Sequence, residues 1–187
     1  MLGIKILPGL SLPMYPMRPT RGRAIRDQHE LTCLHTDVNS GLWHVQPKLN
    51  GDRACLGKVN GAIHICNRHG SWLKHPVTNL TLFKAMPDHT LLDGEVFQSC
   101  FFPFEALALD GCLLLRQCPS QRAETAKQIC ASLGVQWLFK PHVPLWFKNH
   151  ETTEQWEGFV LKRIGSPYIQ LGSAGQESSS WVKRRWA

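Results

Sequence analysis

Short strand-like segments separated by turn residues run from Leu42 to the end of the chain. Aromatic and β-branched residues bounded by Gly, Asn or Pro are typical of such strands. We expect residues 53–59 and 62–67 to form a hairpin, because Asn60-Gly61 between them tolerates the positive φ angles of a two-residue turn. The other expected strands are residues 43–46, which precede a tight segment 47–51, and residues 91–97, 101–109, 159–164, 168–171 and 181–186.

One helix is expected over residues 120–134. Ser120 is a suitable N-cap, apolar side chains recur at helical spacing from Ala123 to Leu133, and Gly134 is a suitable residue to end the helix. A chain of 187 residues is long enough for one ordinary domain with its own core. The sequence therefore predicts one α+β domain dominated by antiparallel strands.

Residues 1–28 differ in composition from the rest, and we expect them to form a separate basic segment before a globular domain at residues 29–187. Their prolines are expected to prevent regular structure. The arginines of this segment would either contact phosphates or remain solvated. These residues are Pro8, Pro13, Pro16 and Pro19, followed by Arg18, Arg21, Arg23 and Arg26.

The composition favours an anionic partner and a reducing compartment. Twenty-one Lys and Arg against 14 Asp and Glu give a net charge of +7, which favours binding to a polyanion such as nucleic acid. The seven cysteines are scattered and never spaced as C-x-x-C, which argues against a disulfide framework or a closed zinc site. No apolar run approaches the roughly 20 residues that cross a bilayer. We expect a soluble, cytoplasmic protein without membrane contact, with a nuclear or viral origin left open.

The segment most informative about chemistry is residues 46–53, which read QPKLNGDR. Lys48 stands at the end of an expected strand, beside Gly51, which lets backbone approach a ligand closely, and Arg53 follows five residues later. Alone, such a string most often marks an exposed lysine before a turn. Further strings follow in order: NRHG at 67–70, LDGEV at 92–96, FPFEAL at 102–107, EGFVLK at 157–162 and WVKRR at 181–185.

This ordered series resembles the covalent nucleotidyltransferase superfamily of ATP-dependent DNA ligases, RNA ligases and mRNA capping enzymes. It is most similar to the adenylation domain of an ATP-dependent DNA ligase, over about residues 43–185. The resemblance implies a ligase-type domain of antiparallel sheets with flanking helices. Because the chain ends at Ala187, soon after the last string, we expect no C-terminal OB-fold. A partner chain would then supply that role, unless the chain is a minimal enzyme or a truncated one.

The resemblance also implies a role for each matching residue. Lys48 would be the nucleophile that becomes adenylylated. Arg53 and Glu95 would contact the ribose, Phe104 would stack on the purine, Lys162 and Lys183 would bind the α-phosphate, and Arg68 would meet a 5′-phosphate or the nucleotide phosphates. The expected nucleotide-binding residues are Gln46, Arg53, Arg68, Glu95, Phe104, Lys162, Lys183 and Arg185, and the expected metal ligands are Glu95 and Glu157.

Elementary chemistry supports these roles. A lysine amine becomes nucleophilic when neighbouring cations and partial desolvation lower its pKa. The same cations stabilise charge on an α-phosphate as pyrophosphate leaves. Glu95 and Glu157 would hold Mg²⁺ or Mn²⁺ among those cations, since carboxylate oxygens suit these ions. The sequence thus predicts ATP and a divalent metal ion as the cofactors.

Four positions depart from the family strings. Asn50 and Glu105 stand where aspartate is usual, Arg185 replaces a lysine, and Gln46 replaces a glutamate near the adenine. The leading hypothesis is an ATP-dependent polynucleotide ligase that acts on a nicked duplex. DNA is favoured because KLNGDRA and FEALALDG look more like DNA ligases. The alternatives are an RNA ligase, a GTP-using capping enzyme, or a non-catalytic nucleic-acid-binding module on the same fold.

Overall fold

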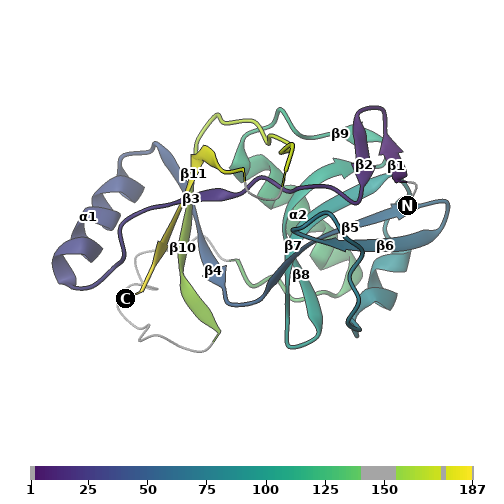
Figure 1. Ribbon diagram of the computed structural model, residues 1–187, viewed down its shortest axis with the longest axis horizontal. Coiled ribbons are helices and arrows are strands. Elements are labelled where there is room, and N and C mark those ends of the chain that lie inside the picture. The colour runs from purple at the N-terminus through teal and green to yellow at the C-terminus, as the bar shows by residue number, and fades with distance from the viewer. Residues whose placement is uncertain (1–2, 140–154, 174–175, 187) are drawn as a thin grey trace.

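The computed structural model describes residues 3–139, 155–173 and 176–186. Two sheets lie next to one another in Figure 1, one of four strands in the order β3-β11-β10-β4 and one of five strands in the order β6-β5-β7-β8-β9. The expected α+β class with mostly antiparallel strands is confirmed. The elements are β1 (Ile4–Leu7), β2 (Leu10–Leu12), β3 (Pro19–Arg21), α1 (Gln28–Asn39), β4 (Trp43–Leu49), β5 (Asp52–Val59), β6 (Ala62–Asn67), the 3-10 helix η1 (Leu80–Ala85), β7 (Thr90–Phe97), β8 (Cys100–Leu109), β9 (Cys112–Leu113), α2 (Pro119–Leu133), β10 (Trp156–Arg163) and β11 (Ser178–Arg185).

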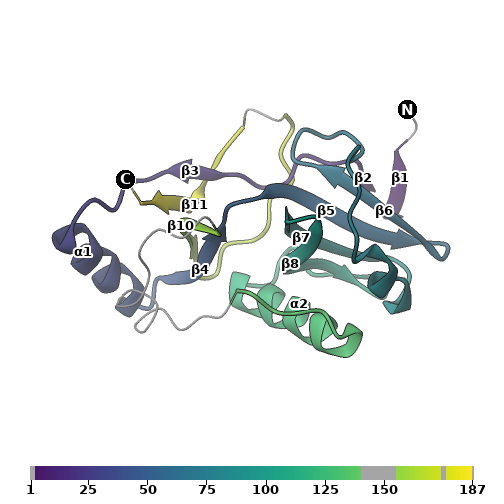
Figure 2. The same ribbon diagram turned by 90° about the horizontal axis from the view of Figure 1, so that it is seen from below.

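The five-stranded sheet is antiparallel throughout. Its expected hairpin is confirmed, with β5 and β6 joined by Asn60 and Gly61 at φ 49° and 75°. Helix α2 lies against one face of this sheet, as Figure 2 shows. Apolar side chains of α2, among them Ala126 and Ile129, share a buried cluster with Leu92 of β7 and Ala106 of β8. Burial of this cluster is the main force that holds the helix on the sheet.

The four-stranded sheet has β10 paired antiparallel with both β4 and β11, while β3 joins β11 in parallel. Helix α1 is next to this sheet, and its Leu34 is buried with Val45, Phe159 and Leu161. The sequence did not predict α1, because few apolar residues mark a stripe between positions 28 and 39. None of the helices in the described residues is long and apolar enough to span a membrane.

The prediction that the first 28 residues lack regular structure is wrong. They form β1, β2 and β3, and Ile6, Leu10 and Leu12 are almost completely buried. The prolines stand where a missing N–H does no harm: Pro8 is in the β1–β2 turn, and Pro19 is the first residue of β3. The division of the chain at residue 28 remains a prediction.

Three smaller expectations also need correction. Helix α2 begins earlier than expected, with Cys118 rather than Ser120 as its N-cap, although Gly134 ends it in the left-handed conformation as predicted. β4 continues through Pro47 to Leu49, where a tight segment was expected, and this is possible because β4 is an edge strand. Residues 168–171 form no strand and make only a single bridge, from Leu171 to Tyr15.

Candidate active site

A pocket of about 200 Å³ has walls from both sheets, and it takes side chains from β4, β5, β7, β8, β10 and β11. All ten residues singled out from the sequence line it. They are Gln46, Lys48, Arg53, Arg68, Glu95, Phe104, Glu157, Lys162, Lys183 and Arg185. The other lining residues are Arg18, Pro19, Pro47, Leu49, Asn50, Gly51, Phe139, Val160 and Trp181.

Lys48 projects from β4 and forms an ion pair with Glu157 of β10. The second carboxylate oxygen of Glu157 forms an ion pair with Arg185, whose Nε lies 2.8 Å away, so one carboxylate bridges two cations. Burial, followed by the charges of Arg185, Arg53 and Lys183, lowers the pKa of Lys48 to about 8, against the opposing effect of Glu95. A lysine with this pKa has a substantial neutral, nucleophilic fraction near physiological pH.

Gly158 explains why Glu157 reaches both cations. Its φ angle is 138°, a conformation that residues with a side chain rarely adopt. A Cβ at this position would collide with the backbone of Arg184, so only glycine allows β11 to approach β10 this closely. Gly158 is paired with Lys48 on one side and with Arg185 on the other. Glu157 is therefore fixed beside the two positive charges.

Arg53 is held by Asp93, a residue that sequence reasoning did not single out. Arg53 Nε and Nη2 lie 3.0 and 2.5 Å from the two carboxylate oxygens of Asp93, which is fully buried. The Tyr168 hydroxyl donates to the same carboxylate at 2.6 Å. Burial alone would lower the pKa of Arg53, but the Asp93 carboxylate outweighs it and raises that pKa. The guanidinium is thus a permanent, oriented positive charge.

Asp93 and Glu95 stand two residues apart on β7, so their side chains point to the same face of the sheet. Gly94 between them faces the Phe101 ring, which a Cβ would approach to 2.6 Å. The D-G-E string is therefore explained by two carboxylates toward the site and a glycine that packs on the core. Burial raises the pKa of Glu95 to about 7, against the lowering effect of Lys48 and Arg53.

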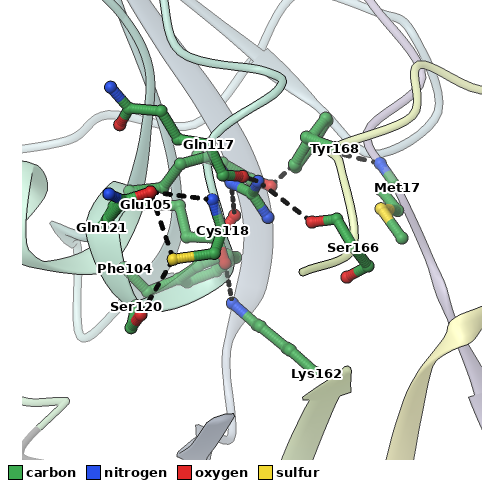
Figure 3. Close-up of polar contacts among 12 residues, drawn as sticks. Met17, Phe104, Glu105, Gln117, Cys118, Ser120, Gln121, Lys162, Ser166 and Tyr168 are labelled. Carbon is green, nitrogen blue, oxygen red and sulfur yellow. Dashed lines mark hydrogen bonds and ion pairs between the residues drawn. The ribbon is translucent and has the colours of Figure 1, made fainter. Parts of the chain in front are cut away.

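A buried polar network holds the Lys162 side chain in place. Lys162 Nζ is 2.6 Å from Glu105 Oε1 and 2.5 Å from Gln46 Oε1. The other oxygen of Glu105 accepts from Arg122 Nε of α2 at 2.9 Å. Figure 3 shows Lys162 pointing toward Glu105 from its own strand. Burial lowers the pKa of Lys162 to about 8, while Glu105 acts in the opposite direction.

Two aromatic rings flank the cations at the centre of the pocket. Lys162 Nζ lies 4.6 Å from the ring centre of Phe104 and 4.1 Å from that of Trp181. Arg53 Cζ lies 5.2 and 5.3 Å from the same two rings. Cation–π contacts of this kind stabilise buried positive charge without neutralising it. The sequence identified Phe104 as a ligand contact but gave Trp181 no such role, because only the folded chain shows which aromatic residue faces the pocket.

The remaining cations lie at the edges of the pocket. Lys183 Nζ is 3.5 Å from Glu177, and the Arg185 side chain is about half exposed. Arg68 is exposed, and its Nε lies 3.2 Å from His69 Nε2. Arg18 comes from the N-terminal segment, where the sequence predicted only a basic arm. The pocket therefore combines fixed cations at its centre with more exposed ones at its rim.

The two expected metal ligands, Glu95 and Glu157, line the same pocket. Among the described residues, no group of three or more His, Cys, Asp or Glu side chains is placed to hold a metal ion. Two carboxylates fit Mg²⁺, since this ion commonly uses one or two of them together with substrate phosphates and water. Glu95 also fits such an ion chemically, because a cation would favour ionisation of a carboxyl whose pKa burial has raised to about 7.

No protein-family model matches the sequence, and no curated protein matches it. Solved structures do match. A mycobacterial DNA ligase D complexed with ATP aligns over 92% of this chain and 60% of its own, at 20% identity and a TM-score of 0.64. The ligase domain of M. tuberculosis LigD aligns over 92% of this chain and 59% of its own, at 21% identity and a TM-score of 0.65. The structure named Pmar-Lig_Pre aligns over 95% and 48%, at 16% identity and a TM-score of 0.59.

The chain therefore shares the fold of these DNA ligase structures. It spans about 60% of the length of the two mycobacterial structures.

Proposed function

We propose that this protein is an ATP-dependent nucleotidyltransferase that forms a covalent lysyl-AMP at Lys48. The single observation that carries the proposal is the surroundings of Lys48. It is a buried amine whose pKa is lowered to about 8 among Arg53, Lys183 and Arg185, in a pocket that also contains two carboxylates and an aromatic ring. Surplus positive charge beside a nucleophilic amine suits attack on a phosphate.

In the proposed step, the Lys48 Nζ lone pair attacks the α-phosphorus of ATP. A nitrogen–phosphorus bond forms, and the bond between the α-phosphorus and the bridging oxygen breaks, so that pyrophosphate leaves with the bonding electrons. The attacking amine loses a proton, and Glu157, already in contact with Nζ, is the acceptor at hand. The ion pair with Arg185, at an Nε–Oε2 distance of 2.8 Å, would keep Glu157 oriented for this transfer.

Other lining residues would bind the rest of the nucleotide. Phe104 would offer a ring for the purine, and Arg53 and Glu95, which line the same pocket, would offer polar partners for the ribose. Lys162 and Lys183 supply positive charge for the α-phosphate, which would stabilise the charge that develops during the reaction. Glu95 and Glu157 would hold a Mg²⁺ or Mn²⁺ ion, which supplies further charge neutralisation at the phosphates when bound.

The complete proposed activity is strand sealing. AMP would pass from Lys48 to a nucleic-acid 5′-phosphate, and a neighbouring 3′-hydroxyl would then displace it. The net charge of +7 and the basic rim of the pocket support a nucleic-acid substrate. A nicked DNA duplex is the favoured substrate, in keeping with the mycobacterial DNA ligase structures that share the fold.

The first test is covalent labelling with α-³²P-ATP and Mg²⁺, followed by denaturing electrophoresis. Wild-type protein should retain the label, Lys48→Ala should lose it, and excess EDTA should abolish it. Lys127→Ala is the matched control, since it removes an exposed lysine of α2 that pairs only with Glu124. Absence of label with both ATP and GTP, while nucleic acid still binds, would indicate a binding module instead of an enzyme.

The second test measures sealing of a nick in DNA and in RNA duplexes by the labelled protein. We expect transfer of AMP to the 5′-phosphate of nicked DNA and formation of the sealed strand. Preferential sealing of RNA nicks would reassign the substrate while leaving the lysyl-AMP chemistry intact. Efficient labelling by GTP in place of ATP would favour a capping-type enzyme.

A further inference from the structure

A second pocket, of about 450 Å³, borders the Lys48 pocket. It is lined by the β6 end, the segment that follows it, and the start of β5. Arg53 and Arg68 line both pockets, so they form a shared wall. A ligand that extends past these arginines from Lys48 would therefore reach the second pocket.

The chemistry of the second pocket suits an anionic chain with sugar or base surfaces. Arg68, His69, Lys74 and His75 are basic residues and are all exposed, whereas Asp52 is the one acidic residue among the described residues that line the pocket. Trp72 adds a half-buried indole ring, which lies 6.0 Å from the His64 ring. Basic side chains bind the phosphates of a nucleic-acid backbone, and an aromatic ring beside them offers an apolar surface for the adjoining sugar.

The segment that forms this pocket is held in place before any ligand arrives. The Asn67 side-chain oxygen accepts hydrogen bonds from the backbone N–H groups of His69 and Ser71 at 2.9 and 3.2 Å. The N–H of Asn67 also donates to the Ser71 carbonyl, and the N–H of Leu73 donates to the Ile65 carbonyl. Little backbone conformational entropy is then lost when this segment binds a strand.

We propose that the second pocket binds the strand that carries the 5′-phosphate, at the nucleotide next to that phosphate. This inference rests on the proposed function, because it takes the reacting 5′-phosphate to lie between Lys48 and Arg68. The strand would continue past Arg68, with a sugar against Trp72 and the first internucleotide phosphate near Lys74 and His75. The pocket would thereby align the strand end for AMP transfer without taking part in adenylylation.

The test uses Lys74→Ala and His75→Ala, with Lys127→Ala as the control that removes the same charge from α2. Both pocket variants should acquire the label from ATP at the wild-type rate, because neither residue lines the Lys48 pocket. Transfer of AMP from the labelled Lys74→Ala protein to nicked DNA should be about tenfold slower. The plot of the logarithm of its association constant for nicked DNA against the logarithm of the salt concentration should also be less steep than that of the wild type, by about one unit of slope.

A modified substrate locates the contact. A neutral methylphosphonate replaces the first internucleotide phosphate of the 5′-phosphorylated strand, and a second substrate carries it ten nucleotides away. The first replacement should weaken binding to the wild-type protein but should have little further effect on Lys74→Ala, since the two changes remove the same contact. The proposal would be overturned if both modified substrates bound the wild-type protein with equally reduced affinity, and if each reduction added in full to the effect of Lys74→Ala.

Binding is measured in a Lys48→Ala background, which separates this proposal from the proposed function. If the Lys48→Ala protein shows the coupling between Lys74 and the first phosphate, the second pocket binds the strand even if labelling by ATP fails. If labelling succeeds but Lys74→Ala transfers AMP at the wild-type rate with an unchanged salt slope, the enzyme stands and the second pocket has no such role.

Discussion

Glu105 of β8 binds Lys162 of β10 with an Oε1–Nζ distance of 2.6 Å, and this ion pair joins the two sheets. Both side chains are almost completely buried. The pair therefore links the five-stranded sheet, which carries Phe104, to the four-stranded sheet, which carries Lys48. This contact therefore helps to set the relative placement of the two halves of the site.

Replacing Glu105 should destabilise the fold as well as the site. Glu105→Gln would leave Lys162 and Arg122 buried without their shared countercharge, at a cost of about 3–5 kcal/mol in the free energy of unfolding. Urea denaturation measures this loss. Glu124→Gln is the control, because its exposed pair with Lys127 should contribute less than about 1 kcal/mol. A Glu105→Gln protein as stable as the wild type would show that the pair is structurally dispensable.

The rate of lysyl-AMP formation should rise with pH up to the pKa of Lys48. This pKa is lowered to about 8, and the amine reacts in its neutral form, so roughly 10% is reactive at pH 7. At saturating ATP and without added pyrophosphate, the single-turnover rate should increase about tenfold from pH 6 to pH 7 and should level off above pH 8. Quenched-flow labelling measures the profile. A rate that is flat between pH 6 and pH 8 contradicts the assignment of the neutral amine as the reacting form.

Asp93→Asn tests whether the orientation of Arg53 matters for nucleotide binding. The amide loses the negative charge and one of the two oxygen acceptors that now hold the guanidinium at 2.5 and 3.0 Å. The Kd for ATP, measured calorimetrically on a Lys48→Ala background, should rise about tenfold, in line with the loss of one charge-assisted hydrogen bond. Asp88→Asn is the control, since Asp88 is half exposed and lies outside the residues that line the pocket. Equal affinities in the two variants would remove Arg53 from the nucleotide site.

The sequence predicted the residues that line the pocket, but it did not predict the residues that position their side chains. Lys48, Glu95 and Glu157 were predicted together from the resemblance of ordered strings to a known family, and all three line one pocket. The role of Asp93 in orienting Arg53 could not be predicted, because the two residues are 40 positions apart in the sequence and come together only when β5 pairs with β7. The roles of these residues in catalysis remain predictions.

The N-terminal segment failed to be predicted for a different reason. Its prolines mark turns and strand starts, and the short strands between them carry too few residues to show alternation. Their stability comes from distant partners, since β3 pairs with β11 near the opposite end of the chain. Helix α1 is similar, because its burial against Val45 and Phe159 is a tertiary property that a weak apolar pattern cannot report.

The chain connects the two sheets covalently at more than one place. Strands β1 and β2 pair as an antiparallel hairpin, whose Leu10 and Leu12 share a buried cluster with Cys55 and Leu91 of the five-stranded sheet. The segment after β2 leads from this hairpin to β3 in the four-stranded sheet. The short turn between β4 and β5 makes a second crossing, directly after Lys48. These tethers limit how far the sheets can separate. The pocket would therefore be nearly preformed when a nucleotide binds. Little of the nucleotide's binding free energy would then be spent on bringing the two sheets together, so that more of it could stabilise the transition state.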